Sequence, residues 1–122
     1  MQINPKEAQE QAMLFEWAVY ARAKYPELLL MFHIPNGGSR NVIEARNLKA
    51  QGVRAGVPDI CLPVPRGKYH GLFIELKRKR GGRVSEEQQG WIAALNRVGY
   101  LAVVCYGFDD AVRTIKGYLE VE

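Results

Sequence analysis

The sequence of 122 residues predicts one α/β domain in which helices cover both faces of a mixed central β-sheet. Segments with helical periodicity alternate with short apolar runs, in the order helix, strand, helix, hairpin, helix, strand, helix. The apolar runs are nearly continuous, which is typical of strands buried on both faces. The composition, 48% hydrophobic and 25% charged, is that of a globular protein. We therefore expect residues 1–122 to form a single domain.

The first helix is expected to begin at Asn4-Pro5. Asparagine is a good N-cap, proline suits the first helical position, and Glu7 supplies an acid in the first turn. Apolar residues then recur at helical spacing through about Lys24, so this helix buries one stripe.

The middle of the chain predicts a strand, a helix and a hairpin. A continuous apolar run at 28–34 indicates a buried strand that ends at a glycine-rich turn. Residues 41–51 form a helical segment stopped by Gly52. Two further apolar runs, 59–62 and 71–77, are separated by a basic turn and predict an antiparallel hairpin.

The C-terminal third predicts helix, strand, helix. Ser85 and Gln88 satisfy the capping-box pattern at the start of a helix. The side of this helix expected to be buried carries Trp91, Ile92, Leu95 and Val98. A strand at 101–105 and an amphipathic helix at 109–119 follow.

Charge and cysteine content limit the function classes. The chain has 17 Lys plus Arg and 13 Asp plus Glu, a net charge of +4, and the basic residues concentrate between Arg66 and Arg83. Such an excess permits nucleic-acid binding without requiring it. Cys61 and Cys105 lie in separate apolar runs and are expected to be reduced and buried. No segment has the length and apolarity of a membrane span, so a cytoplasmic protein without a membrane partner is expected.

Two acids and a lysine interrupt apolar strands: Asp59 after Pro58, and Glu75 and Lys77 in the second strand of the hairpin. Buried charge is costly unless it is paired or binds a metal. Residues two apart on a strand share a face, so Glu75 and Lys77 project together, and pairing of the two strands can place Asp59 across from Glu75. The alternative is a structural Glu–Lys pair at a strand edge, which is common for an E-x-K triplet alone.

Two carboxylates and an ammonium suit phosphodiester cleavage with a hard cation, Mg²⁺ or Mn²⁺. Asp59, Glu75 and the backbone carbonyl of Leu76 are the expected metal ligands. Lys77 is expected to orient the attacking water or to neutralise charge on the phosphate. No small-molecule organic cofactor is expected.

The wider pattern resembles the PD-(D/E)XK nuclease superfamily and, within it, the VRR-NUC branch of virus-type replication and repair nucleases. The motif residues are Gly56-Val57-Pro58-Asp59, Ile74-Glu75-Leu76-Lys77, Gly82, Ser85 and Gln88. The resemblance implies a restriction-endonuclease-like core and a site in which Gln88 joins Asp59, Glu75 and Lys77. It also implies a homodimer that acts on branched DNA in a bacterial or phage-infected cell.

The superfamily also has a glutamate on its first helix, and Glu7 and Glu10 both qualify because they lie on one face at i and i+3. Glu7, followed by Gln11, is slightly preferred, although it also completes a capping box with Asn4. Gln88 likewise allows two interpretations. It is either a capping residue, as the third helical residue after Ser85, or a site residue.

The expected DNA contacts are basic: Lys79, Arg80 and Arg83 after the hairpin, and Arg40 in the glycine-rich turn. His33 has no ligand-like spacing and is interpreted as a strand-end residue. Together these features predict a structure-selective, metal-dependent DNA endonuclease, and the family resemblance implies that it is similar to a Holliday-junction resolvase. The alternatives are a non-catalytic nucleic-acid-binding module on the same fold and a sequence-specific restriction-type nuclease.

Overall fold

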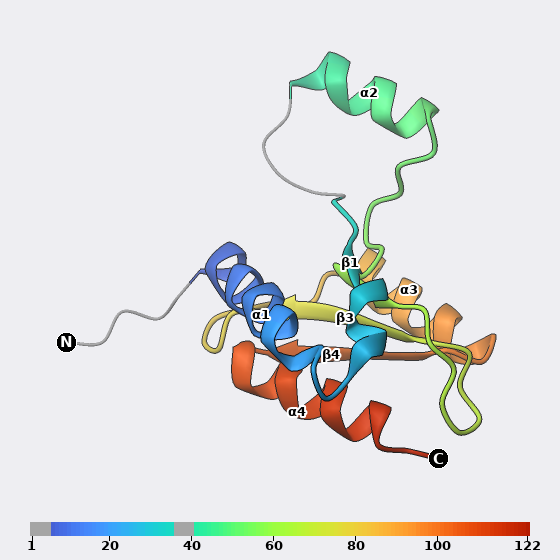
Figure 1. The fold of residues 1–122 in the computed structure, drawn as a ribbon. Coiled ribbons are helices and arrows are strands. Elements are labelled where there is room, and N and C mark those ends of the chain that lie inside the picture. The colour runs from blue at the N-terminus through green and yellow to red at the C-terminus, as the bar shows by residue number, and fades with distance from the viewer. Residues whose placement is uncertain (1–5, 36–40) are drawn as a thin grey trace.

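A mixed four-stranded sheet with helices on both faces forms the body of the protein (Figure 1). The computed structural model describes residues 6–35 and 41–122. Along the chain the elements are α1 (Glu7–Ala21), the 3₁₀ helix η1 (Pro26–Leu30), β1 (Phe32–His33), α2 (Val42–Ala50), β2 (Ile60–Leu62), β3 (Leu72–Lys77), α3 (Glu86–Arg97), β4 (Leu101–Tyr106) and α4 (Phe108–Leu119). The mixed α/β architecture predicted from the sequence is confirmed.

The strands lie side by side in the order β1-β2-β3-β4. The pairs β1–β2 and β2–β3 are antiparallel, whereas β3–β4 is parallel. The predicted hairpin is therefore present, with Ile60 opposite Ile74 and Leu62 opposite Leu72. The parallel pair is joined through α3, as parallel strands require a crossover connection.

The hydrophobic core lies between one face of the sheet and the helices α1 and α4. Alternate residues of β3, Leu72, Ile74 and Leu76, point into this layer and are buried. Leu14 from α1 and Ile115 from α4 meet them in the same hydrophobic cluster. The other face of β3 carries Phe73, Glu75 and Lys77 and lies towards α3.

The segment predicted as a strand at 28–34 instead begins as the end of a 3₁₀ helix, which covers residues 28–30. Pro26 occupies its first turn, and the backbone N–H groups of Leu28 and Met31 are bonded to carbonyls three residues earlier. Only Phe32 and His33 pair with β2. The prediction was wrong because a continuous apolar run does not distinguish a strand from a buried helical turn.

The ends of α1 also differ from the expectation. The helix begins at Glu7 after Lys6, and it ends at Ala21 rather than Lys24. Within the first turn, the side chain of Gln9 accepts a hydrogen bond from the backbone N–H of Lys6. The proposed cap, Asn4, lies outside the described residues.

The outer face of the sheet is more thinly covered than predicted. No residue of α3 is fully buried. Val98, expected on the buried side, is at the C-terminal end of α3 and is 62% exposed. The reason is that α3 packs over the face of the sheet that carries charged groups, whereas the apolar cluster is on the opposite face.

The helix α2 stands clear of the sheet and of the other helices (Figure 1). None of its residues is buried. Its N-terminus is capped, because the Asn41 side chain accepts a hydrogen bond from the N–H of Glu44. Gly52 follows its end with a positive φ, as predicted. Both connections of α2 to the body, at Pro35 and at Val57, approach the hairpin that carries the acidic residues.

Both cysteines are free and buried, as expected. Burial raises the pKa of the Cys105 thiol to about 11, so this thiol stays protonated at neutral pH. No helix among the described residues is long and apolar enough to cross a membrane.

Candidate active site

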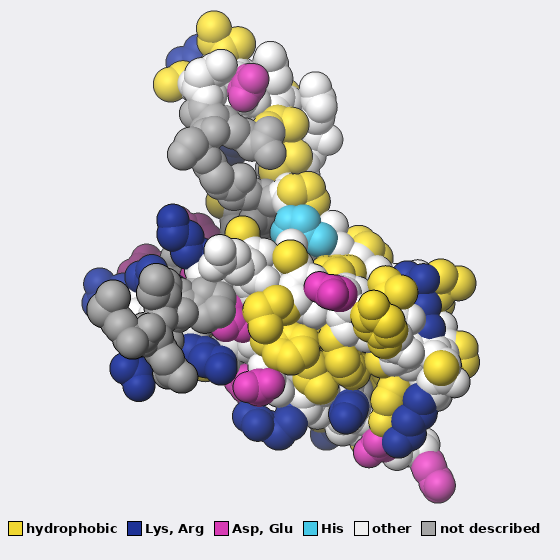
Figure 2. Space-filling model, turned by 60° about the vertical axis from the view of Figure 1, so that its left-hand side comes forward, with side chains coloured by type: hydrophobic (Ala, Val, Ile, Leu, Met, Phe, Trp, Pro, Cys, Tyr) yellow, Lys and Arg dark blue, Asp and Glu magenta, His cyan; other side chains and the backbone are white. Residues whose placement is uncertain are grey.

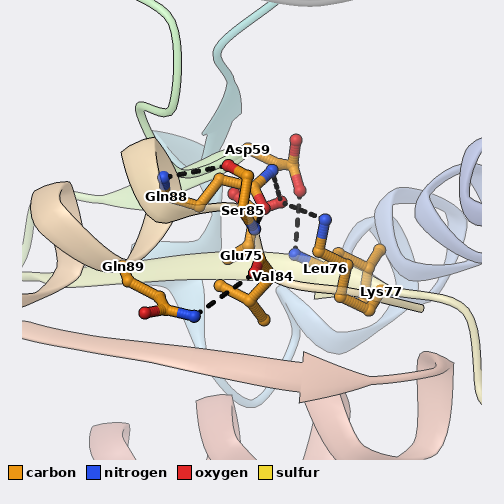
Figure 3. Close-up of polar contacts among 8 residues, drawn as sticks. All are labelled: Asp59, Glu75, Leu76, Lys77, Val84, Ser85, Gln88 and Gln89. Carbon is orange, nitrogen blue, oxygen red and sulfur yellow. Dashed lines mark hydrogen bonds and ion pairs between the residues drawn. The ribbon is translucent and has the colours of Figure 1, made fainter.

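The β2–β3 hairpin brings Asp59, Glu75 and Lys77 together (Figure 3). Asp59 immediately precedes β2, and its Oδ2 accepts a hydrogen bond of 2.8 Å from the backbone N–H of Leu76. This bond fixes the Asp59 carboxylate against β3. The predicted convergence of the two acids and the lysine is therefore present in the structure.

Glu75 and Lys77 are charged groups in a buried setting, with 2% and 6% of their surfaces exposed. Lys77 Nζ lies 3.5 Å from Glu75 Oε2, and Gln88 Nε2 of α3 donates a 3.0 Å hydrogen bond to the same oxygen. The other carboxylate oxygen, Glu75 Oε1, is buried without a hydrogen-bond partner among the described residues. A buried oxygen of this kind is unfavourable unless a further ligand contacts it.

The environment of Glu75 raises its pKa to about 8. Burial is the largest cause, and the nearby Asp59 carboxylate adds to it, while Lys77 acts in the opposite direction. Two carboxylates placed together at such a cost are typical of a cation site.

The donor set fits a hard divalent cation that completes its coordination with water and phosphate. Asp59 and Glu75 supply two carboxylates, and Leu76 lines the same cleft. Among residues 6–35 and 41–122, no group of three or more His, Cys, Asp and Glu side chains converges as a complete metal cage. Mg²⁺ in particular is usually held by one or two carboxylates, with water and substrate oxygens at the other positions.

Gln88 serves both of the roles considered from the sequence. Its Oε1 accepts a hydrogen bond from the Ser85 N–H at 2.8 Å and completes the capping box of α3, while its Nε2 donates to Glu75. The cap orients the amide so that its nitrogen faces the acid. One side chain thus starts the helix and contacts the site.

The structure explains why the motif that ends at Asp59 contains a glycine and a proline. Gly56 has a φ of +91°, and a Cβ at this position would lie 2.6 Å from the backbone carbon of Glu87. Only glycine allows the chain to pass this close to the first turn of α3. Pro58 is fully buried next to it. The motif therefore fixes Asp59 relative to α3 as well as to β3.

An open cleft of about 330 Å³ lies over these groups. It is lined by Glu7, Ala8, Gln11, His33, Pro35, Asp59, Glu75, Leu76 and Gln88. The helix α1 therefore contributes Glu7 to the cleft, one turn before Gln11.

The two glutamates of α1 are in different environments. Glu7 is exposed at the cleft. Glu10 is 1% exposed and accepts a hydrogen bond from the backbone N–H of Phe108 at the start of α4. A carboxylate at a helix N-terminus is a stabilising arrangement, so Glu10 ties α1 to α4. Of the two candidates, Glu7 is the one that the fold places at the cleft.

His33 is a cleft residue that the sequence analysis did not select. Its Nδ1 lies 2.8 Å from the carbonyl oxygen of Asp59, across the β1–β2 pair. No spacing in the sequence relates these two residues, because they are brought together only by strand pairing. The ring therefore borders the same space as the acids.

The basic residues expected to bind DNA follow β3. Arg80 and Arg83 are exposed. Lys79 is paired with Asp109 at 3.5 Å, and since both side chains are largely exposed this contact is weak. Arg40 lies outside the described residues.

Comparisons with known proteins agree with this geometry. The family model of the VRR-NUC domain matches residues 3–109, which include every residue of the motif. A solved structure of a protein named "VRR_NUC domain protein" is 31% identical, with a TM-score of 0.84, and the match covers 98% of this chain and 93% of that chain. Among curated proteins, no sequence matches the chain. The VRR-NUC domain implies a nuclease-type function with DNA as the substrate, and the extent of both matches shows that this chain belongs to the VRR-NUC family.

Proposed function

We propose that this protein is a Mg²⁺- or Mn²⁺-dependent DNA endonuclease that acts on branched DNA. The observation that carries the proposal is a pair of carboxylates at an open cleft, the half-buried Asp59 and the buried Glu75, with Lys77 beside Glu75. A purely structural Glu–Lys pair has no need of a second carboxylate that raises the pKa of the first.

Each residue has a definite task in phosphodiester hydrolysis. Asp59 and Glu75 would hold the cation, and the Leu76 carbonyl would be a further oxygen ligand. When bound, the cation supplies Lewis-acid activation of the phosphate and of a water molecule. Lys77 carries a fixed positive charge that stabilises the additional negative charge on the phosphate oxygens during attack. Gln88 keeps the Glu75 carboxylate in place through its 3.0 Å hydrogen bond.

Glu7 and the exposed cations extend the site beyond its floor. Glu7 faces the cleft from α1 and is the fifth catalytic residue of the proposal. Arg80, Arg83 and Lys79 are the proposed phosphate contacts outside the cleft, and Arg40, which is not among the described residues, is proposed as a further phosphate contact from its sequence alone. Phosphate contacts position a protein on DNA without carrying sequence information directly, so this proposal favours recognition of DNA shape.

We also propose that the protein acts as a homodimer, so that two sites can cut two strands. Hydrophobic side chains gather on the face seen in Figure 2, viewed from the side of α1. Leu29, Leu30 and Phe32, from η1 and the edge strand β1, are 66%, 55% and 47% exposed. Exposed apolar surface of this kind is typical of a protein interface.

The experiment is cleavage of labelled four-way junction, flap, single-stranded and plain duplex DNA with Mg²⁺, Mn²⁺ or EDTA. The variant Glu75→Gln keeps the size of the side chain but removes its charge, and Glu16→Gln on the exposed face of α1 is the matched control. We expect cutting of branched DNA that needs the metal and Glu75 but not Glu16. Binding without cutting would favour the non-catalytic module, and cutting of one duplex sequence would favour a restriction-type enzyme.

A further inference from the structure

A second cavity lies beside the catalytic cleft. It has a volume of about 400 Å³ and is lined by Ile34, Pro35, Gln51, Gly52, Val53, Arg54, Val57 and Trp91. Pro35 borders both cavities, so they are neighbours across a single residue. The volume lies in the range of small-ligand sites.

Two side chains give this second cavity a distinct chemistry. Trp91 contributes an indole ring that is only partly buried. The hydrophobic cluster described for residues 6–35 and 41–122 includes Trp17 but not Trp91. Arg54 is exposed, and no acid among the described residues forms an ion pair with it. An aromatic ring, an unpaired guanidinium and apolar walls therefore surround one space.

The helix α3 connects the two cavities. Gln88 lies at the catalytic cleft and Trp91 lies at the second cavity, and residues three apart share one face of a helix. The remaining walls come from the two connections that join α2 to the body. A ligand in the second cavity would thus lie next to a phosphate bound in the catalytic cleft.

We propose that the second cavity binds one unpaired nucleobase of the DNA substrate. The base stacks on the indole of Trp91, and Arg54 contacts the adjoining phosphate. Stacking on an aromatic side chain accepts any base, because every base has a π-face. The inference rests on the proposed function, and it identifies the substrate as DNA with an unpaired nucleotide beside the scissile phosphate.

The test measures Trp91 fluorescence in EDTA, where no metal-dependent cleavage occurs. The full chain carries Trp17→Phe, so that Trp91 is its single tryptophan. The probe is a duplex with three unpaired thymidines, and the matched probe has abasic sites at those three positions, with the same phosphates. We expect quenching by the thymidine probe alone. Equal quenching by both probes, or none, would overturn the proposal.

Affinity provides the second readout. For the thymidine probe, Trp91→Leu is expected to weaken binding by roughly 5- to 150-fold, the range for loss of one stacked base, whereas Trp91→Phe retains most of the affinity. The abasic probe should bind all three proteins equally. If Trp17→Phe does not fold, the unaltered chain gives the same comparison of the two probes, since Trp17 packs against the core.

The outcomes separate this proposal from that of the nuclease. Base-dependent quenching without any metal-dependent cleavage would retain the cavity assignment and reject the enzyme. Cleavage that depends on Glu75, with no difference between the thymidine and abasic probes, would retain the enzyme and reject the cavity assignment. A fluorescence change that follows protein concentration without DNA would show that a second copy covers the cavity and would overturn the proposal.

Discussion

The two faces of β3 bury chemically different side chains near the C-terminal end of the strand. Ile74 and Leu76 are each 1% exposed against α1 and α4, while Glu75 and Lys77 are 2% and 6% exposed on the opposite face. Burying an aliphatic side chain stabilises the fold by about 1.5–3 kcal/mol. Burying a charge costs several kcal/mol before its partners are counted. One strand thus has one face that provides stability and one face whose cost is explained by function.

The largest expected effect is on cleavage. Removing the ammonium with Lys77→Met, or the Asp59 charge with Asp59→Asn, should lower the cleavage rate by about 10³-fold, equivalent to about 4 kcal/mol of barrier. Thermal unfolding should show that each variant remains folded. Unchanged turnover in either variant would remove that residue from the site and weaken the contrast between the faces.

A substitution on the apolar face of β3 should affect the stability of the fold. Ile74→Ala deletes buried methyl groups and is expected to lower the free energy of unfolding by about 2–5 kcal/mol, measured by urea titration. Glu75→Gln, one residue away, should leave stability nearly unchanged at neutral pH in the metal-free protein, because a pKa of about 8 keeps Glu75 largely protonated there and glutamine has the same size. If Ile74→Ala were harmless and Glu75→Gln strongly destabilising, the division between the two faces would be wrong.

Gln88 gives a smaller effect that separates its two roles. Gln88→Glu keeps an oxygen that accepts the Ser85 N–H but replaces the donor facing Glu75 with another acid. We expect cleavage to fall by about 10- to 100-fold, as for other residues that orient a metal ligand, with helix α3 retained by circular dichroism. Loss of the helix together with activity would indicate a capping role alone.

The smallest effect is a pH dependence of stability in the metal-free protein. Burial and Asp59 raise the pKa of Glu75 from its ordinary 4.5 to about 8, so the folded state binds this proton more tightly than the unfolded chain. The contribution of Glu75 to stability is therefore complete below the unfolded pKa and is lost as the pH rises through about 8. In EDTA, the stability of the wild type relative to Glu75→Gln should decline between about pH 5 and about pH 9. A constant difference would show that Glu75 is ionised throughout.

Local sequence rules were sufficient for the centre of the site. The period of two along a strand places Glu75 and Lys77 on one face, and the antiparallel pairing of consecutive strands brings Asp59 to them. The capping box of α3 is equally local, because Ser85 and Gln88 are three residues apart. These features depend on neighbours within one element or one turn, so they could be predicted before the fold was known.

The tertiary structure alone decided which residues surround the centre of the site. The period of α1 places Glu7 and Glu10 on one face, and only the packing of α4 assigns Glu10 to Phe108 and leaves Glu7 at the cleft. His33 reaches Asp59 through strand pairing between distant segments. Trp91 lines a cavity rather than the core because α3 packs on the face of the sheet opposite the apolar cluster, beside the connections of α2. Sequence periodicity states which face of an element a residue occupies, but not what the rest of the chain places against that face.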